Sequence, residues 1–146
     1  MKRTPTEIKL QQTSRILQVS FEDETFKLPC EYLRVHSPSA EVQGHGPGQE
    51  VLQKSKEKVN IVAIEPVGHY AVRLIFDDSH NTGLYSWELL YDLGINARQH
   101  WQRYLQRLEA ASHLRVSQDS DKYLVWVKGL NQQINFKNKT IDLDNG

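Results

Sequence analysis

A short pattern that occurs twice is the feature that most limits how this chain can fold. Phe21-Glu22-Asp23 is followed by Glu31-Tyr32-Leu33, and the same order returns as Phe76-Asp77-Asp78 and Glu88-Leu89-Leu90. Each copy is predicted to contain a strand pair, an acidic turn, a returning strand and a short helix. A unit of about 30 residues buries its own apolar face poorly, so we expect the two copies to pack against each other.

The predicted strands follow from short runs of β-branched, aromatic and alternating apolar residues. They are expected at 8–10, 16–21 and 25–28 in the first copy and at 59–64, 70–76 and 83–85 in the second. A polar turn that contains acidic residues separates the second strand from the third in each copy. This order predicts an antiparallel hairpin followed by a short helix in each copy.

Helix signals follow the third strand of each copy. Pro29 stands where a helix can begin, because the first turn does not need its missing N–H group. A second start is predicted at Ser37, which can cap a helix, with Pro38 at the first helical position. In the second copy, Ser86 is predicted to cap the helix and Gly94 to end it.

The longest predicted helix spans 96–111. Its apolar residues recur at spacings of three and four, which places them on one stripe. They are Ala97, Trp101, Tyr104, Leu105, Leu108 and Ala111. Short strands are expected after this helix, at 113–117, 123–127, 133–136 and 140–143.

The predicted fold class is therefore α+β. It combines duplicated antiparallel hairpin-plus-short-helix units, one longer amphipathic helix and a C-terminal meander of short strands. The expected organisation is a domain at 1–95, a helix packed on it at 96–112 and a β-rich extension at 113–146.

Charge balance and residue usage narrow the function classes. The 18 Lys and Arg residues balance 18 Asp and Glu residues, whereas nucleic-acid binders usually carry a basic surplus. No apolar run approaches the roughly 18 residues of a membrane span, and no apolar core of a signal peptide follows Met1. We expect a cytoplasmic protein that binds neither nucleic acid nor membrane. The single cysteine, Cys30, lies among apolar residues and is predicted to be a buried thiol.

Several separated motifs agree in order and spacing with one known family. They are Leu33-Arg34-Val35-His36-Ser37-Pro38-Ser39-Ala40-Glu41-Val42-Gln43-Gly44-His45-Gly46, Val67-Gly68-His69-Tyr70-Ala71-Val72, Asp77-Asp78-Ser79-His80 and Tyr85-Ser86-Trp87-Glu88-Leu89-Leu90. Together these segments resemble the compact bacterial form of the gamma-butyrobetaine hydroxylase-like N-terminal domain. The resemblance covers about residues 5–95.

The resemblance also carries an expectation about metal. In the oxygenases of carnitine synthesis, this domain holds a zinc ion through three cysteines and one histidine. The resemblance places the cysteine positions on Ser37, Ser39 and Val42, and the histidine position on His80. Zinc binds thiolate, imidazole or carboxylate groups, so two serine hydroxyls and a valine leave the ligand set incomplete. We expect no zinc site and no cofactor.

Hydroxylase activity does not follow from the resemblance. The oxygenases carry their iron in a separate domain, through two histidines and a carboxylate, and residues 96–146 are too few for that domain. Similar domains also occur fused to Mrp-type P-loop ATPases that carry iron–sulfur clusters. The expected function is a non-catalytic accessory or binding module in iron–sulfur or metalloprotein maturation, with an iron–sulfur carrier ATPase or a metalloprotein as its partner. Two alternatives stay open: a metal-binding domain associated with a 2-oxoglutarate oxygenase, and a protein-interaction domain of another pathway.

The candidate binding residues lie around a glycine-rich loop. Gly44–Gly48 lacks the Gly-Lys-Ser/Thr ending of a phosphate loop, but loops on a rigid scaffold often carry binding residues. A polar patch that recognises a protein partner is predicted from Arg34, His36, Glu41, His45, Asp78 and His80. If His36, His45 and His80 converged, they could instead hold a divalent metal, with Glu41 as fourth ligand. No catalytic residue is predicted, because no nucleophile elbow or activated cysteine pattern is present.

Overall fold

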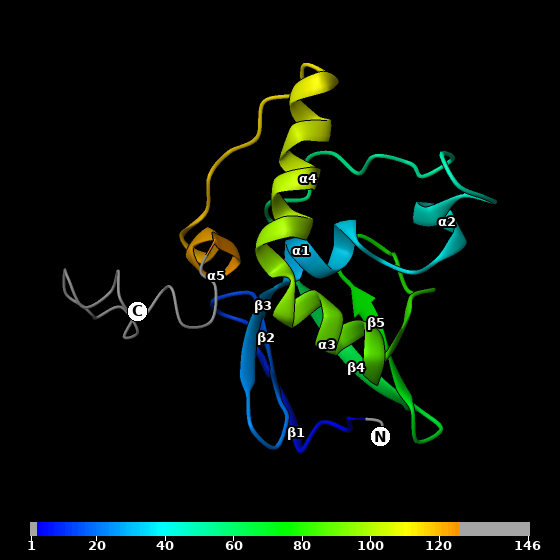
Figure 1. The fold of residues 1–146 in the computed structure, drawn as a ribbon, viewed down its shortest axis with the longest axis vertical. Coiled ribbons are helices and arrows are strands. Elements are labelled where there is room, and N and C mark those ends of the chain that lie inside the picture. The colour runs from blue at the N-terminus through cyan, green and yellow to red at the C-terminus, as the bar shows by residue number, and fades with distance from the viewer. Residues whose placement is uncertain (1–2, 126–146) are drawn as a thin grey trace, which may run out of the picture.

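The computed structural model describes residues 3–125 of the chain. It is an α+β structure, as predicted, and the strands of these residues form two three-stranded antiparallel sheets. Figure 1 shows the sheets in the lower part of the molecule and the long helix above them. No helix among residues 3–125 is long and apolar enough to cross a membrane.

The first sheet contains β1 (Glu7–Gln11), β2 (Ile16–Ser20) and β3 (Thr25–Pro29), in that order. The short helix α1 (Cys30–Val35) follows without a loop, and all of its residues are buried. The predicted buried thiol of Cys30 is confirmed, since the residue is fully buried.

The second sheet repeats this arrangement with β4 (Ile61–Val67), β5 (Ala71–Phe76) and β6 (Leu84–Ser86). A register shift near Ile61 marks a bulge in β4. The helix α3 (Trp87–Ile95) then begins at Ser86, whose side chain accepts a hydrogen bond from the Leu89 amide. The predicted cap at Ser86 is therefore confirmed.

The two copies share their acidic turn as well as their strand order. The Phe21 amide donates to the Glu24 carbonyl in the first copy, and the Phe76 amide donates to the His80 carbonyl in the second. Leu33 of α1 and Leu90 of α3 are both fully buried, as the repeat predicts. The duplicated pattern in the sequence thus corresponds to one topology used twice.

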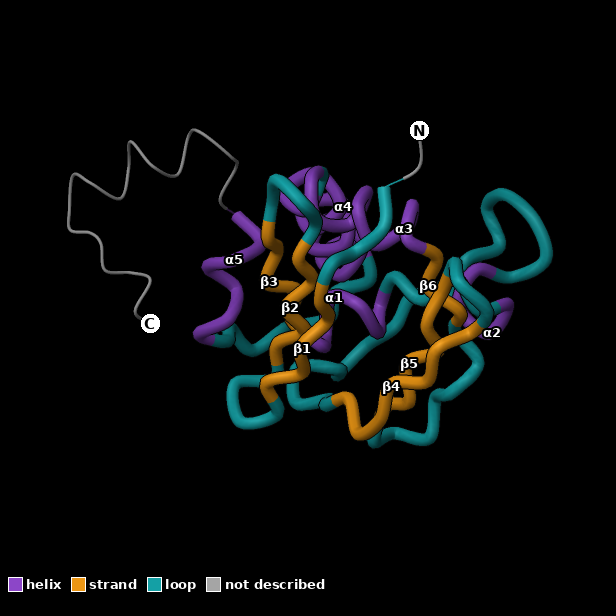
Figure 2. Tube along the Cα trace, turned by 90° about the horizontal axis from the view of Figure 1, so that it is seen from below, coloured by secondary structure: helices purple, strands orange, loops and turns teal. Residues whose placement is uncertain are grey.

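The core lies between the two sheets and the helices. Figure 2 shows the sheets side by side with α3 and α4 (Ala97–Ala110) above them. The predicted stripe of α4 turns inward through Trp101, Tyr104 and Leu108, which are buried. The Tyr32 hydroxyl donates to the Leu93 carbonyl at 2.7 Å, which ties the first copy to the second.

Gly94 has a different role from the one predicted. It lies inside α3, which continues to Ile95, so it does not end the helix. A Cβ at this position would lie 2.4 Å from the ring of Phe26. Glycine is therefore needed because β3 and α3 pack closely at this point.

The predicted strand at 113–117 is wrong, because this segment is a loop that forms no ladder with another strand among residues 3–125. The predicted strand at 123–127 is also wrong as far as it is described: a 3₁₀ turn, η1 (Asp119–Asp121), leads into the helix α5 (Lys122–Val125). A short apolar run such as Tyr123-Leu124-Val125 fits a strand or a helix equally well by its pattern. The strands expected at 133–136 and 140–143 lie outside the described residues.

Candidate functional site

The segment after α1 forms a second short helix, α2 (Ala40–Gln43). Its cap is Ser39, whose hydroxyl accepts a hydrogen bond from the Glu41 amide, and not Ser37 as predicted. The Ser37 hydroxyl instead accepts a hydrogen bond from the Ser39 amide at 3.2 Å. The Gln43 side chain donates to the Ser37 carbonyl at 2.7 Å. These bonds fold the chain tightly around Ser37.

A chain of hydrogen bonds joins this segment to the acidic turn of the second copy. Ser37 Oγ lies 2.8 Å from His80 Nε2, and His80 Nδ1 lies 2.9 Å from Glu41 Oε1. Ser39 Oγ lies 2.7 Å from Thr82 Oγ1 and adds a second link. Ser37 is fully buried and His80 is 3% exposed. We call Ser37, His80 and Glu41 the clasp.

The partners of the clasp determine where the protons lie. The Glu41 carboxylate can only accept, so His80 Nδ1 carries a proton and donates it. His80 Nε2 then accepts from the Ser37 hydroxyl in the neutral ring. Burial lowers the pKa of His80, and the nearby Arg34 guanidinium lowers it further, whereas Glu41 raises it. A neutral His80 therefore satisfies every polar atom of the clasp.

A second polar group, formed by four side chains, lies beside the clasp. Arg34 Nε donates to Asp78 Oδ2 at 2.9 Å and Arg34 Nη1 donates to Gln53 Oε1 at 3.0 Å. Lys56 Nζ donates to the same Asp78 oxygen at 2.6 Å. Asp78 Oδ1 also accepts the His80 amide. Arg34 is buried, and these bonds give its charged guanidinium the partners that a charge in the interior requires.

The structure brings four of the six predicted patch residues together: Arg34, Glu41, Asp78 and His80. Only Glu41 among these has a mostly exposed side chain, at 64%. Arg34 and His80 were predicted to lie on the surface as part of the patch. Both are buried beneath it. Their burial depends on contacts between distant segments, which no local pattern records.

The other two residues of the predicted patch lie apart from this cluster. His36 turns to the opposite side, where its Nδ1 donates to the Tyr32 carbonyl and its ring packs near His100 and Tyr104. His45 is exposed in the glycine-rich loop. The three histidines therefore do not converge, and among residues 3–125 no group of three or more His, Cys, Asp or Glu side chains is placed to hold a metal ion.

The residues at the expected zinc positions do not fit that metal. Ser37 and Ser39 offer hydroxyls that already form hydrogen bonds with His80 and Thr82. Val42 offers no ligand atom and is buried. Both ring nitrogens of His80 are also engaged. Since zinc requires thiolate, imidazole or carboxylate donors, this donor set cannot build a zinc site.

The order of groups in the clasp matches that of a nucleophile, a base and an orienting acid. Such a nucleophile must reach its substrate, and Ser37 is 0% exposed. Its oxygen also accepts the Ser39 amide, which places it inside the turn. The clasp therefore holds segments together and has no room for a substrate at Ser37.

Five further residues support the clasp and the Arg34–Asp78 group but were not predicted from the sequence: Gln43, Gln53, Lys56, Thr82 and Gly83. Gly83 gave the only signal that could have been used, because it directly follows the acidic turn. A Cβ there would lie 2.6 Å from Ser37 Oγ, so a glycine lets the two segments approach.

Comparison with known proteins places the fold in one family. The family model described as "Gamma-butyrobetaine hydroxylase-like, N-terminal" matches residues 8–91. No curated protein matches the sequence significantly.

Solved structures agree with this family. Two solution NMR structures are 51% and 44% identical to the chain, with TM-scores of 0.68 and 0.70. The chain covers 91% and 94% of them, over 81% and 82% of its own length. A crystal structure from Acidithiobacillus ferrooxidans, of a protein of unknown function in the DUF971 family, is 41% identical with a TM-score of 0.52. The alignment covers 62% of this chain and 91% of that one. The chain thus belongs to the gamma-butyrobetaine hydroxylase-like N-terminal domain family.

Proposed function

We propose that this protein is a non-catalytic binding module that docks a protein partner on residues 40–51, which we call the α2 loop. The observation that carries the proposal is the contrast between the base and the tip of this loop. Its base is fixed by buried hydrogen bonds, and its tip is exposed to solvent. Binding residues commonly lie on loops that a rigid scaffold positions.

The base of the loop is held at several points. The clasp and the Ser39–Thr82 bond join its first turn to the second copy of the repeat. The Val51 amide donates to the Val42 carbonyl at 2.8 Å, which closes the loop at its other end. Gly44 has a φ of 75°, and a Cβ there would overlap the Gln49 carbonyl. The loop therefore has little conformational freedom in the free protein. Less conformational entropy is lost when a partner binds, so the entropic cost of binding is lower.

His45 at the tip of the loop, and Glu41 and Val51 near its base, offer exposed groups for recognition. Glu41 and His45 are exposed, and Val51 is a large apolar residue that is 53% exposed. Figure 1 shows α2 and its loop standing out to one side of the molecule, away from α4. A partner could contact this projection without any change in the core.

The partner class that we propose is an iron–sulfur carrier ATPase or another metalloprotein under maturation. Support comes from the family resemblance, since similar domains occur fused to Mrp-type P-loop ATPases that carry iron–sulfur clusters. The clasp agrees with a non-catalytic role, because its serine is inaccessible.

The test is a quantitative pull-down from native cells with tagged wild-type protein and the double variant Glu41→Gln/His45→Ala. Both positions are exposed, and Glu41→Gln keeps a side-chain oxygen that can accept from His80 Nδ1, so the variant should unfold at nearly the same temperature as the wild type. We expect the variant to lose the iron–sulfur or other metalloprotein partner that the wild type captures. Glu22→Gln/His69→Ala is the matched control, because it makes the same two changes in exposed turns elsewhere.

The control variant should retain the partner. Equal recovery of that partner by the wild type and by Glu41→Gln/His45→Ala would contradict docking on the α2 loop. Capture of enzymes without metal centres, and of no metalloprotein, would contradict the proposed partner class.

A further inference from the structure

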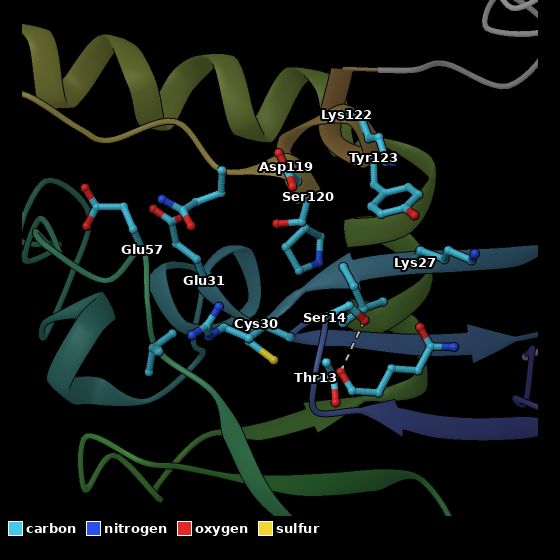
Figure 3. A pocket seen from close by; sticks show the side chains of 16 residues that line it. Thr13, Ser14, Lys27, Cys30, Glu31, Glu57, Asp119, Ser120, Lys122 and Tyr123 are labelled. Carbon is cyan, nitrogen blue, oxygen red and sulfur yellow. Dashed lines mark hydrogen bonds between the residues drawn. The ribbon is translucent and has the colours of Figure 1, made fainter. Parts of the chain in front are cut away.

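A polar groove of about 350 Å³ lies on the first copy of the repeat, away from the clasp. The β1–β2 turn, the end of β3 and the start of α1 form its floor, and the segment from Gln118 to Tyr123 forms its other wall. Its volume is at the lower end of the range for small-molecule sites. Figure 3 shows Lys27, Lys122 and Tyr123 together at one end of the groove, and Glu31 and Glu57 at the other.

Three cationic side chains line this groove without carboxylate partners. Lys27 Nζ lies 5.5 Å and Lys122 Nζ lies 5.4 Å from the centre of the Tyr123 ring. Arg15 is the third cation of the lining. None of the three forms an ion pair with a carboxylate among residues 3–125. Both ammonium groups contact the Tyr123 ring, and neither has a carboxylate counter-ion there.

The carboxylates of the lining do not neutralise this charge. Glu31 accepts two hydrogen bonds from Arg115, at 2.7 and 2.8 Å, and the same guanidinium also binds Asp121. Glu57 accepts the Val116 amide at the far end of the groove. Glu31 and Glu57 lie at the other end of the groove from Lys27 and Lys122, so Asp119 is the remaining carboxylate of the lining (Figure 3). The end of the groove near Tyr123 therefore has a positive surplus.

The same lining is rich in hydrogen-bond donors. The hydroxyls of Thr13, Ser120 and Tyr123 form no hydrogen bond with other side chains or with the backbone in the part of the chain that the structure describes. Together with the two lysines and Arg15, they offer donors that suit an acceptor with several oxygens.

We infer that this groove binds a small polyanion that carries phosphate or carboxylate groups. The anion lies against Lys27, Lys122 and Arg15, and hydroxyls of the lining donate to its oxygens. The ligand is bound without covalent chemistry, since Cys30 in the floor is fully buried. Burial also raises the pKa of that thiol to about 12, which keeps it protonated.

The test is an NMR titration of the full chain with sodium pyrophosphate and, separately, with citrate, at constant ionic strength. We expect saturable shifts of the backbone amides of Arg15, Cys30 and Tyr123 with at least one of the two probes. Saturation by pyrophosphate alone assigns the groove to phosphate groups, and saturation by citrate alone assigns it to carboxylates. Absence of saturable shifts with both probes overturns the inference.

A pair of variants separates a specific site from general attraction of anions. Arg15→Gln/Lys27→Gln/Lys122→Gln should weaken binding of the active probe by at least about tenfold. Lys54→Gln/Arg98→Gln/Arg103→Gln removes the same charge from exposed positions elsewhere and should leave binding within about twofold. Equal weakening by the two triple variants overturns the inference. The shifts of the wild-type protein locate the site even if the first variant fails to fold.

Discussion

His80 donates to Glu41 from one ring nitrogen and accepts from Ser37 at the other, so both sides of a buried ring are satisfied. At the level of single residues, this bond set explains why a serine stands beside a histidine in the interior. Removal of the serine hydroxyl leaves His80 Nε2 and the Ser39 amide without partners, since both bonds meet at Ser37 Oγ. A buried polar group without a partner is costly.

Ser37→Ala should therefore lower the free energy of unfolding by roughly 1–3 kcal/mol. Urea unfolding followed by circular dichroism measures this change. Ser117→Ala, at an exposed position, is the control and should stay within about 0.5 kcal/mol of the wild type. Equal stability of the two variants would show that the Ser37–His80 bond does not hold the segments together.

The stability of the folded protein also depends on a second histidine, His36, in its neutral form. Burial lowers the pKa of His36 to about 4, the hydrogen bond to Tyr32 opposes this shift, and His100 and Arg107 lower the pKa further. The unfolded chain, with a histidine pKa near 6.5, then binds more protons than the folded one between pH 6.5 and about 4. Stability is therefore complete above pH 6.5 and falls as the pH decreases through this window.

Between pH 7.5 and pH 5, the contribution of His36 should fall by roughly 2 kcal/mol. His36→Phe keeps an aromatic ring against Tyr32 and Tyr104 but cannot bind a proton. Its free energy of unfolding should therefore fall less than that of the wild type over the same range. Urea unfolding at the two pH values measures both. An identical pH dependence of wild type and variant would contradict the role assigned to His36.

At the level of elements, the segment after α4 is held by one arginine and not by strand pairing. Arg115 forms bidentate hydrogen bonds with Glu31 of α1 and with Asp121 of η1. Its guanidinium also lies 4.6 Å from the Trp101 ring centre. These side-chain contacts, and not ladder hydrogen bonds to another strand, position residues 113–117, which explains why the strand prediction failed there. Side-chain ion pairs between α1 and a distant turn leave no periodic signal in the sequence.

Arg115→Met should destabilise the protein by about 3 kcal/mol or more, because it leaves the buried Glu31 carboxylate without its partner. A second change, Glu31→Gln, should restore part of this loss when combined with the first. Thermal unfolding of the single and double variants measures the difference, with the exposed Arg98→Met as control. A double variant that is less stable than Arg115→Met alone would contradict the ion-pair account.

For the whole molecule, the repeat in the sequence was enough to predict two similar antiparallel units and the helix across them. The capping serine of α3 and the apolar stripe of α4 were also predictable, because both are local patterns. The arrangement of the site was not. Ser37 and His80 are distant in the sequence, and their bond arises only when the two copies pack together. The requirement for glycine at position 94 could not be predicted either, because it comes from close packing against Phe26 of β3.

We conclude that hydrogen bonds hold the α2 loop to the second copy of the repeat, and we expect no metal ion to contribute. Urea unfolding of the tag-free protein, with a strong chelator and with added zinc, tests this claim most directly. A structural zinc contributes roughly 10 kcal/mol or more in apparent binding free energy, so its removal would lower the unfolding midpoint measurably. We predict the same unfolding midpoint under both conditions. A midpoint that falls in chelator and recovers with zinc would contradict the account.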